Sequence, residues 1–266
     1  MYLGNFIKKL DKKYNKVYFS GIAFNSAKVK KDYIFFAIKG NNFDGNNYIQ
    51  EAIEKGAKVV VTEKKINFQN KEVIYLKSKN SRKLLAELSY KFIKKNVKKL
   101  IAVTGTNGKS SVADFYYQIL NLSKKRAASI GTIGIQSKNK KKEIENTTLN
   151  PIELSKIIND LGFKKIDHII LEASSHGLKQ NRLDGLSFDL GIFTNLSHDH
   201  LDYHKNFRDY LNSKLYLFKN LIKKGGHVIL DSTIPQFKEI KKISIKKGLK
   251  LETVFGKNSD LELVTH

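Results

Sequence analysis

Residue types that hold metal ions are concentrated in one short stretch, His198 to His204, which reads HDHLDYH. Imidazole suits zinc and other transition metals, whereas Mg²⁺ prefers the oxygen atoms of carboxylates. The stretch directly follows DLGIFTNLS, an apolar run that is typical of a buried strand. The sequence therefore predicts a metal site just beyond the end of a strand, although the stretch alone selects neither the metal nor its chemistry.

A second chemical feature is the loop VTGTNGKSS, Val103 to Ser111, which lies between an apolar strand and a helix. Glycines allow backbone N–H groups to face phosphates, and the start of the helix adds positive potential. Lys109 can reach the β- and γ-phosphates, and Ser110 can bind Mg²⁺. Val103 stands where the strict G-x-x-x-x-G-K-[ST] pattern has its first glycine, so the loop is a variant. The expected nucleotide-binding residues are Gly105, Thr106, Asn107, Gly108, Lys109, Ser110 and Ser111.

Strand and helix patterns alternate along the chain and predict an α/β protein. In the first part, DYIFFAIKG and EVIYLKS are expected to be strands, and SRKLLAELSYKFIKK a helix. A charged segment at residues 94–99 then separates a small N-terminal α/β domain, residues 1–97, from a central P-loop domain, residues 98–266. The central domain is expected to hold a mostly parallel sheet with helices on both faces, and its chemistry at the carboxyl ends of the strands.

The elements of the central domain follow from the same patterns. KLIAVTG, ASIGTIGI, HIILEAS, DLGIFTNLS and HVILD are expected to be strands. One helix is bounded by Asn150 as N-cap, Pro151 in the first turn and Gly162 past its end. Another is expected within residues 206–226, with apolar positions at steps of three and four. Lys214 lies in that apolar stripe, where an ammonium group is expensive to bury, so the pattern predicts a special role for it.

The bulk composition limits the classes of function. The absence of cysteine excludes disulfides, thiolate metal sites and cysteine nucleophiles. No apolar run approaches the roughly 20 residues of a membrane span, and the N-terminus lacks a secretory signal, so we expect a cytoplasmic protein with no membrane partner. The net charge of +24 would suit nucleic acid, but only four of the 49 basic residues are arginine and the lysines are spread along the chain. That distribution favours a solvated lysine surface and no nucleic-acid partner.

Several segments together resemble a known family. The spelling TGTNGKSS of the phosphate loop is similar to that of the Mur ligase superfamily, and ENTTLNP, LEASSHGLKQNRLDG, DHLDYH and DYLNSKLYLF resemble its MurE-type branch. That branch adds the third amino acid, meso-diaminopimelate or L-lysine, to UDP-N-acetylmuramoyl-L-alanyl-D-glutamate. The resemblance implies a monomeric, ATP-dependent amide ligase of peptidoglycan precursor synthesis that uses ATP and Mg²⁺, works through an acyl phosphate, and has the UDP-muramoyl dipeptide and an amino acid as its partners.

The resemblance also implies roles for individual residues. The implied catalytic set is Lys109, Glu172, His200 and Lys214. The implied ligands of Mg²⁺ are Ser110, Glu172, His200 and Lys214. In this family the lysine that matches Lys214 is carbamylated, which turns a cation into an oxygen ligand. His200 would then be the one metal ligand within HDHLDYH, and His198 would be dispensable. The other polar residues of the stretch, expected to shape the loop or approach the phosphates, are Asp199, Asp202 and His204.

Substrate contacts are implied by the same resemblance. In the central domain they are Asn146, Thr147, Thr148, Ser174, Gln180 and Arg182. In the N-terminal domain, which holds the UDP end of the substrate in this family, they are Phe24, Ser26, Asn41, Asn42 and Phe43. The family usually has Asp-Ser-Arg where this chain has Asn25-Ser26-Ala27, and this departure bears on the nucleotide-sugar contacts.

Mur ligases have three domains, so we expect this chain to lack the third domain, to be incomplete at the C-terminal end of the central one, and to be inactive by itself. One alternative is another ATP ligase of the superfamily, such as a folylpolyglutamate synthetase, which shares the phosphate loop. A second is a metallohydrolase with zinc at HDHLDYH, which the extra residue before His204 disfavours and which leaves the phosphate loop unexplained. A third is a basic P-loop protein that binds nucleic acid.

Overall fold

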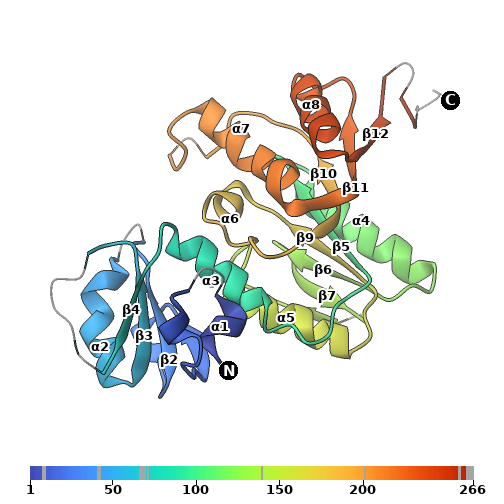
Figure 1. Ribbon diagram of the computed structural model, residues 1–266. Coiled ribbons are helices and arrows are strands. Elements are labelled where there is room, and N and C mark those ends of the chain that lie inside the picture. The colour runs from blue at the N-terminus through green and yellow to red at the C-terminus, as the bar shows by residue number, and fades with distance from the viewer. Residues whose placement is uncertain are drawn as a thin grey trace. The chain divides into compact units, whose positions relative to one another are not determined.

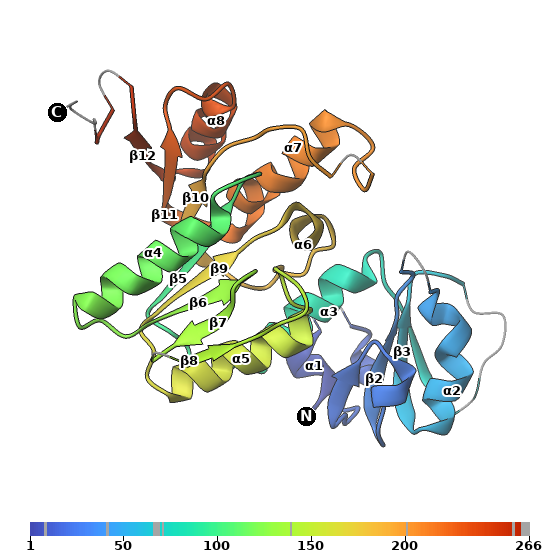
Figure 2. The same cartoon turned by 180° about the vertical axis from the view of Figure 1, so that it is seen from behind.

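The computed structural model describes residues 1–7, 10–40, 43–65, 70, 72–138, 140–200, 202–256 and 259–261. The chain divides into two compact units, Met1–Phe92 and Ile93–His266. The sequence pattern had placed this division between residues 97 and 98. Each unit has its own sheet with helices packed on it (Figures 1 and 2), so the α/β class predicted from the sequence is confirmed.

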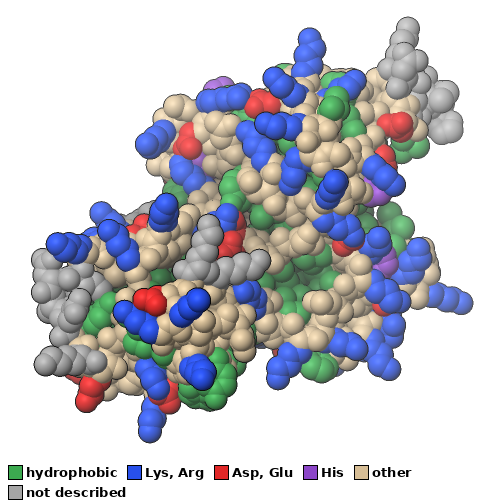
Figure 3. Space-filling view, viewed as in Figure 1, with side chains coloured by type: hydrophobic (Ala, Val, Ile, Leu, Met, Phe, Trp, Pro, Cys, Tyr) green, Lys and Arg blue, Asp and Glu red, His purple; other side chains and the backbone are tan. Residues whose placement is uncertain are grey.

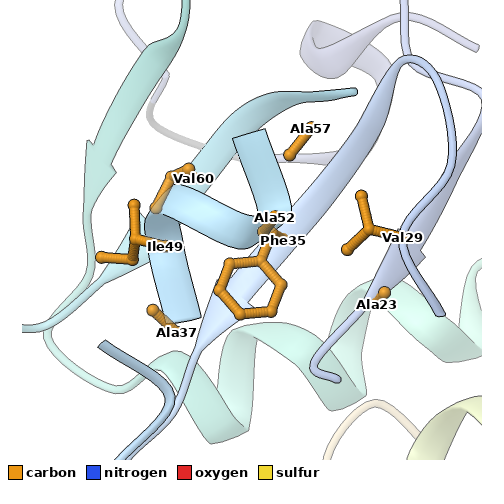
Figure 4. Close-up of a cluster of buried hydrophobic side chains, with 8 residues drawn as sticks. All are labelled: Ala23, Val29, Phe35, Ala37, Ile49, Ala52, Ala57 and Val60. Atoms are coloured by element: carbon orange, nitrogen blue, oxygen red, sulfur yellow. The ribbon is translucent and has the colours of Figure 1, made fainter. Parts of the chain in front are cut away.

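The first unit is built on a four-stranded parallel sheet in the order β1-β2-β3-β4. Its strands are β1 (Gly21–Ala23), β2 (Tyr33–Ala37), β3 (Ala57–Thr62) and β4 (Ile74–Lys77). Its helices are α1 (Leu3–Phe6), α2 (Ile49–Glu54) and α3 (Ser81–Tyr90), with 3₁₀ turns η1 (Lys12–Tyr14), η2 (Ser26–Lys28) and η3 (Gly45–Tyr48). One core cluster joins α2 to the sheet and consists of Ala23, Val29, Phe35, Ala37, Ile49, Ala52, Ala57 and Val60 (Figure 4).

Helix α3 ends at Tyr90, earlier than the periodic pattern up to residue 95 predicted. Phe92 lies beyond the helix, where its ring packs against Phe6 and Phe19 with centroid separations of 5.4 and 6.3 Å. The expected helix was therefore too long, because the pattern counted as helical a ring that belongs to an aromatic cluster built by tertiary packing.

The second unit contains an eight-stranded sheet in the order β12-β11-β10-β5-β9-β6-β7-β8. Its strands are β5 (Lys99–Thr104), β6 (Ala127–Gly131), β7 (Gly134–Ser137), β8 (Lys140–Lys142), β9 (His168–Glu172), β10 (Phe188–Phe193), β11 (Ile222–Asp231) and β12 (Lys250–Val254). All pairs from β12 to β6 are parallel, and β6–β7 and β7–β8 are antiparallel. The predicted mostly parallel sheet is thus confirmed.

Helices cover both faces of this sheet. They are α4 (Lys109–Leu122), α5 (Pro151–Phe163), α6 (Ser175–Lys179), α7 (Phe207–Tyr216) with the π turn η4 (Leu217–Leu221), and α8 (Phe237–Lys247). Helix α4 packs on Ile101 and Val103 of β5. On β10, Gly191 points to the other face and meets the side chain of Phe218 in η4, so α7 and its π turn lie opposite α4.

Three element boundaries differ from the prediction. The run ASIGTIGI is not one strand but the antiparallel pair β6 and β7, because residues 132–133 form a turn and Gly134 has a φ of +106°. Gly162 lies inside α5, where an added Cβ would come 2.1 Å from the Lys95 carbonyl oxygen, so close packing explains the glycine. The helix expected within residues 206–226 ends in the π turn, and strand β11 begins at Ile222.

The order of the strands brings three carboxyl ends together. Strand β5 lies between β9 and β10, with Val103 paired to Glu172 and Thr104 paired to Phe193. The segments that follow these strands are the phosphate loop, the start of α6, and the loop that leads to HDHLDYH. No helix among the described residues is long and apolar enough to cross a membrane.

Candidate functional site

The phosphate loop, residues 105–108, joins β5 to α4 in the strand–loop–helix arrangement that the sequence indicated. Gly105 and Gly108 have φ values of +153° and +79°, which other residues rarely adopt. A Cβ added to Gly105 would lie 1.8 Å from Thr194 Oγ1, so a side chain is excluded there for steric reasons as well. The backbone of the loop is therefore free to face a ligand at the N-terminus of a 14-residue helix.

Lys109 begins α4 and folds back over this loop. Its Nζ atom donates to the carbonyl oxygens of Thr106 (2.6 Å) and Gly105 (3.1 Å). Burial lowers the pKa of Lys109, while the carboxylates of Glu172 and Asp199 act in the opposite direction. Nearby on the same helix turn, the phosphate-loop candidates Ser110 and Ser111 are half-buried and exposed, respectively. The loop therefore carries a cation and a hydroxyl at the position where phosphates bind a helix N-terminus.

The loop is held by the segment after β10, a contact that the sequence analysis missed. Asn107 N donates to Asn195 Oδ1 (2.9 Å), and Asn107 O accepts from Thr194 Oγ1 (2.6 Å). Thr106 Oγ1 accepts from the backbone N–H of Ser197 (3.0 Å) and lies 3.1 Å from the hydroxyl of Tyr210, a fully buried residue. The signal was present in the sequence as the polar letters TNLS directly after a predicted strand.

Glu172 ends β9 and is 2% exposed, so its carboxylate is buried beside the loop. Its Oε2 atom accepts from Ser110 Oγ (2.9 Å) and Thr132 Oγ1 (3.2 Å), and its Oε1 atom accepts from Thr132 N (2.8 Å). Gly131 makes room for it, because an added Cβ there would lie 2.0 Å from Glu172 Oε1. Thr132 was not among the sequence candidates, since the sequence interpretation placed it in the middle of a strand.

Lys214 lies on α7 and is 1% exposed. Its Nζ atom donates to Gly105 O (2.6 Å) and lies 4.3 Å from the centre of the Tyr210 ring. Burial, and then the neighbouring ammonium of Lys109, lower the pKa of Lys214 to about 7. A neutral, nucleophilic amine is consequently well populated near neutral pH, and it lies directly behind the phosphate loop.

The histidines of HDHLDYH take three different positions. His198 is exposed and stacks on Phe207, with ring centroids 4.8 Å apart. His200 has a left-handed φ of +52° and packs against the rings of His176 (4.9 Å) and Tyr210 (6.2 Å). Its own Nε2 lies 3.4 Å from Asp199 Oδ2. None of these contacts is with Glu172, the residue that the sequence analysis paired with His200 as a metal ligand.

His204 is buried in the second unit, with no exposed side-chain surface. Its Nε2 atom lies 3.0 Å from Ser175 Oγ, and its Nδ1 atom lies 3.5 Å from Ser213 Oγ and 3.6 Å from Asp209 Oδ2. Burial, followed by the charge of Lys179, lowers the pKa of His204 to about 4. His204 thus joins α6 to α7 as a neutral ring, in keeping with the expectation that it shapes the loop.

The first group of expected substrate residues lies along one polar row beside Glu172. Thr148 Oγ1 donates to Glu172 O (2.8 Å) and lies 3.0 Å from Ser174 Oγ, which caps helix α6. Thr147 Oγ1 lies 3.0 Å from Thr132 Oγ1, and Asn146 is exposed. The structure therefore brings the segment NTT to the same strand ends as the phosphate loop.

The second group joins that row to the histidine stretch. Arg182 donates from Nη1 to Thr148 O, and from Nε and Nη2 to Gln180 Oε1 (3.0 and 2.8 Å). Gln180 Nε2 in turn donates to the hydroxyl of Tyr203 (3.0 Å), whose ring stacks on His176 at 3.9 Å. Part of the Arg182 guanidinium is consequently engaged within the protein.

The first unit has a cavity of about 410 Å³ that contains several of its expected substrate residues. Its lining consists of Phe24, Asn25, Ser26, Phe35, Ile38, Gly40, Phe43, Gly45, Tyr48 and Arg82. Ser26 is 7% exposed and donates from Oγ to Glu51 Oε2 (2.8 Å), so its hydroxyl is engaged within the protein. Sequence reasoning missed Arg82, whose Nη2 atom donates to Lys39 O (2.7 Å). The expected residues Asn41 and Asn42 lie outside the described residues.

The side chains bonded to the Glu172 carboxylate, Ser110 and Thr132, are both hydroxyls, and carboxylate and hydroxyl oxygens suit a hard cation such as Mg²⁺. By contrast, in the part of the chain that the structure describes, no group of three or more His, Cys, Asp or Glu side chains could hold a metal ion. The apparent zinc cluster at HDHLDYH is therefore dispersed over exposed, stacked and buried positions.

Two family models match the chain. Residues 103–265 match the Mur ligase middle domain, and residues 18–95 match the Mur ligase family, catalytic domain. Among curated proteins, the UDP-N-acetylmuramoyl-L-alanyl-D-glutamate--2,6-diaminopimelate ligase of Rickettsia montanensis is 43% identical over 247 residues, which cover 91% of this chain and 51% of that protein. The ligase of the same name from Clostridium tetani is 40% identical over 232 residues, covering 84% of this chain and 47% of that protein. The chain thus spans about half the length of the curated relatives it matches.

Solved structures agree with this fold. A structure of a UDP-N-acetylmuramoyl-L-alanyl-D-glutamate--2,6-diaminopimelate ligase superposes with a TM-score of 0.84 and 24% identity, covering 97% of this chain and 53% of that one. The MurF ligase from Thermotoga maritima, solved in complex with ADP, gives a TM-score of 0.56 at 18% identity, covering 90% of this chain and 51% of that one.

Proposed function

This chain belongs to the Mur ligase family, and from that premise we propose that it provides the nucleotide-binding and dipeptide-binding parts of an ATP-dependent amide ligase of peptidoglycan precursor synthesis. The observation that carries the proposal is the contact between Ser110 and Glu172, which joins the phosphate loop to a buried carboxylate. A metallohydrolase does not account for that pairing, and the match to the Mur ligase middle domain favours the ligase over a nucleic-acid-binding P-loop protein.

In the proposed reaction, the side-chain carboxylate of the D-glutamyl residue takes the γ-phosphoryl group of ATP, giving an acyl phosphate and ADP. The amine of the third amino acid then attacks the acyl carbon, phosphate leaves, and an amide bond forms. The names of the curated relatives support diaminopimelate as that amino acid. No covalent protein nucleophile is required, so the protein acts by binding, orienting and neutralising charge.

Lys109 is the residue best placed to neutralise charge on the phosphates. In the structure its ammonium is bound to two loop carbonyls, and ATP would draw it toward the β- and γ-phosphates. Ser110 and Glu172 would hold Mg²⁺ through oxygen atoms, with Thr132 orienting the carboxylate through two hydrogen bonds. Bound there, the cation would supply further positive charge to the transferring phosphoryl group.

Lys214 is proposed to be carbamylated. Its lowered pKa leaves an uncharged amine available to add CO₂, and the resulting carbamate would be an oxygen donor beside Gly105. His200 is retained as a proposed ligand on the resemblance alone, because its contacts are with Asp199 and neighbouring rings.

Substrate contacts are proposed for each unit by itself. The cavity of the first unit offers aromatic walls for a base, from Phe24, Phe43 and Tyr48, and the guanidinium of Arg82 for a diphosphate. In the second unit, Thr147, Thr148 and Arg182 are proposed to contact the peptide end. The residues at the phosphate loop bind ATP and those of the first unit bind the uridine nucleotide.

Calorimetric titration of this chain with ATP, with GTP and with the UDP-muramoyl dipeptide, each with Mg²⁺ present, tests the proposal. We expect saturable ATP binding that Lys109→Ala weakens by about tenfold or more, and separate binding of the dipeptide nucleotide. The control Lys242→Ala removes an exposed lysine of α8 and should change neither affinity. ATP-independent hydrolysis supported by Zn²⁺, or no ATP binding at millimolar concentration, would contradict the proposal.

A further inference from the structure

Hairpin β7–β8 lies beside helix α5, with β8 at the edge of the sheet (Figure 2). A groove lined by residues of this hairpin and of α5 contains no residue of the phosphate loop. Its volume is about 480 Å³, and its apolar side chains are Ile135, Ile157 and Leu161. None of the residues assigned above to nucleotide, metal or substrate lines it. The groove therefore has no role in the proposed reaction.

The walls of the groove are strongly basic. Its lysines are Lys138, Lys140, Lys141, Lys142 and Lys164, and its one acidic lining residue is Asp160. Across the described ranges, none of these five lysines forms an ion pair. Lysine and arginine are spread over the face shown in Figure 3, so basic charge alone does not distinguish this place.

What distinguishes the groove is an open strand beside it. Lys140 and Lys142 of β8 pair with Ser137 and Ile135 of β7, and directly opposite residues share a face of the sheet. Both lysines therefore point to the side on which Ser137 and Ile135 line the groove. Within the described part of the chain, no strand pairs with the other edge of β8. The unpaired backbone groups of β8 thus lie beside two lysines and the apolar side chains that line the groove.

We propose that this groove binds an extended acidic segment of a partner protein, which adds as a strand to the free edge of β8. The backbone of the segment would pair with β8, and its alternate carboxylates would lie on the groove side of the sheet, where they would meet Lys140 and Lys142. Edge lysines normally discourage pairing with another strand. The positive charge of the edge lysines discourages a neutral or basic strand from pairing, but it attracts an acidic strand.

The test uses a fluorescein-labelled peptide of alternating Glu and Val, titrated with the protein and followed by fluorescence anisotropy. Lys140→Glu combined with Lys142→Glu should weaken binding by about tenfold or more. The matched control, Lys242→Glu with Lys246→Glu, makes the same charge change on exposed positions of α8 and should alter binding by less than about twofold. Equal losses in both double variants would overturn the proposal, because binding would then follow net charge.

Two further readouts separate strand addition from simple attraction of an anion. Amide hydrogen exchange in β8 should slow when the peptide binds, and the same peptide with alternate N-methylated residues should bind at least about tenfold more weakly. If the methylated peptide binds as well as the parent, strand addition is wrong. A different outcome is that an oligothymidylate binds more tightly than the peptide and loses its binding in the Lys140→Glu, Lys142→Glu variant. In that case the groove is a nucleic-acid surface and the proposal fails.

Discussion

The buried His204 predicts a specific dependence of stability on pH. The folded protein keeps this imidazole neutral, because burial and the charge of Lys179 lower its pKa from 6.5 to about 4. In the unfolded chain it would titrate with its ordinary pKa. The unfolded state therefore binds a proton more tightly than the folded state, and the contribution of His204 to stability is complete above pH 6.5 and declines as pH falls toward 4.

The magnitude follows from the difference between the two pKa values. Each unit corresponds to about 1.4 kcal/mol, so the full loss is roughly 3 kcal/mol, of which about 2 kcal/mol is reached by pH 5. His204→Gln removes the titrating group while retaining a side chain that can bond to Ser175. The variant is less stable than the wild type at neutral pH, because the ring packing with Tyr210 is lost, and this deficit should shrink as the pH falls.

Urea denaturation of both proteins, followed by far-UV circular dichroism at intervals from about pH 7.5 to about pH 5, measures this effect. Carboxylates that do not contact His204 act equally on both proteins. Asp209, which lies beside His204, has a pKa lowered chiefly by Lys179 and so stays ionised over this interval. The difference between the two free energies of unfolding therefore isolates His204. We expect that difference to fall by about 2 kcal/mol over the interval. A difference that stays constant to within about 0.5 kcal/mol would refute the assignment of His204 as a neutral buried ring.

Gly131→Ala should weaken Mg²⁺-dependent ATP binding by about tenfold or more with the circular dichroism spectrum unchanged, because the added Cβ would meet Glu172 Oε1. After incubation with ¹³C-bicarbonate, the wild type should show a carbamate carbon resonance that Lys214→Met lacks; an identical resonance in both would place the modification elsewhere. Arg82→Gln should weaken UDP binding, measured by calorimetry, by about tenfold, whereas Arg126→Gln, which removes a surface partner of Asp167, should leave it within about twofold.

The phosphate loop was predictable because its determinants are local. Glycines, a lysine and a hydroxyl occur in consecutive positions between a strand and a helix, whereas the contacts that Thr194, Asn195 and Ser197 make with the loop were not predicted. The parallel sheet was predictable for a similar reason, since apolar strands alternate with amphipathic helices. The run ASIGTIGI was misinterpreted because an apolar sequence does not reveal a reversal at Thr132, and this error concealed one of the two residues that orient Glu172.

The surroundings of the proposed metal ligands were harder to predict, because they depend on tertiary contacts. Spacing made HDHLDYH resemble one cluster, yet His204 is fixed by Ser175 of α6, and His200 is turned by a left-handed backbone toward the rings around it. Lys214 was found from its place in an apolar stripe. Its hydrogen bond to Gly105, more than one hundred residues away, could not be read from the sequence.

The central claim is that Ser110 and Glu172 hold Mg²⁺ for ATP bound at the phosphate loop. It is tested most directly by the dissociation constant of ATP, measured by calorimetry with and without Mg²⁺, for the wild type and Glu172→Gln. We predict that Mg²⁺ tightens ATP binding by about tenfold or more in the wild type and by less than about twofold in the variant, with similar Mg²⁺-free affinities. An undiminished Mg²⁺ effect in Glu172→Gln would contradict the claim.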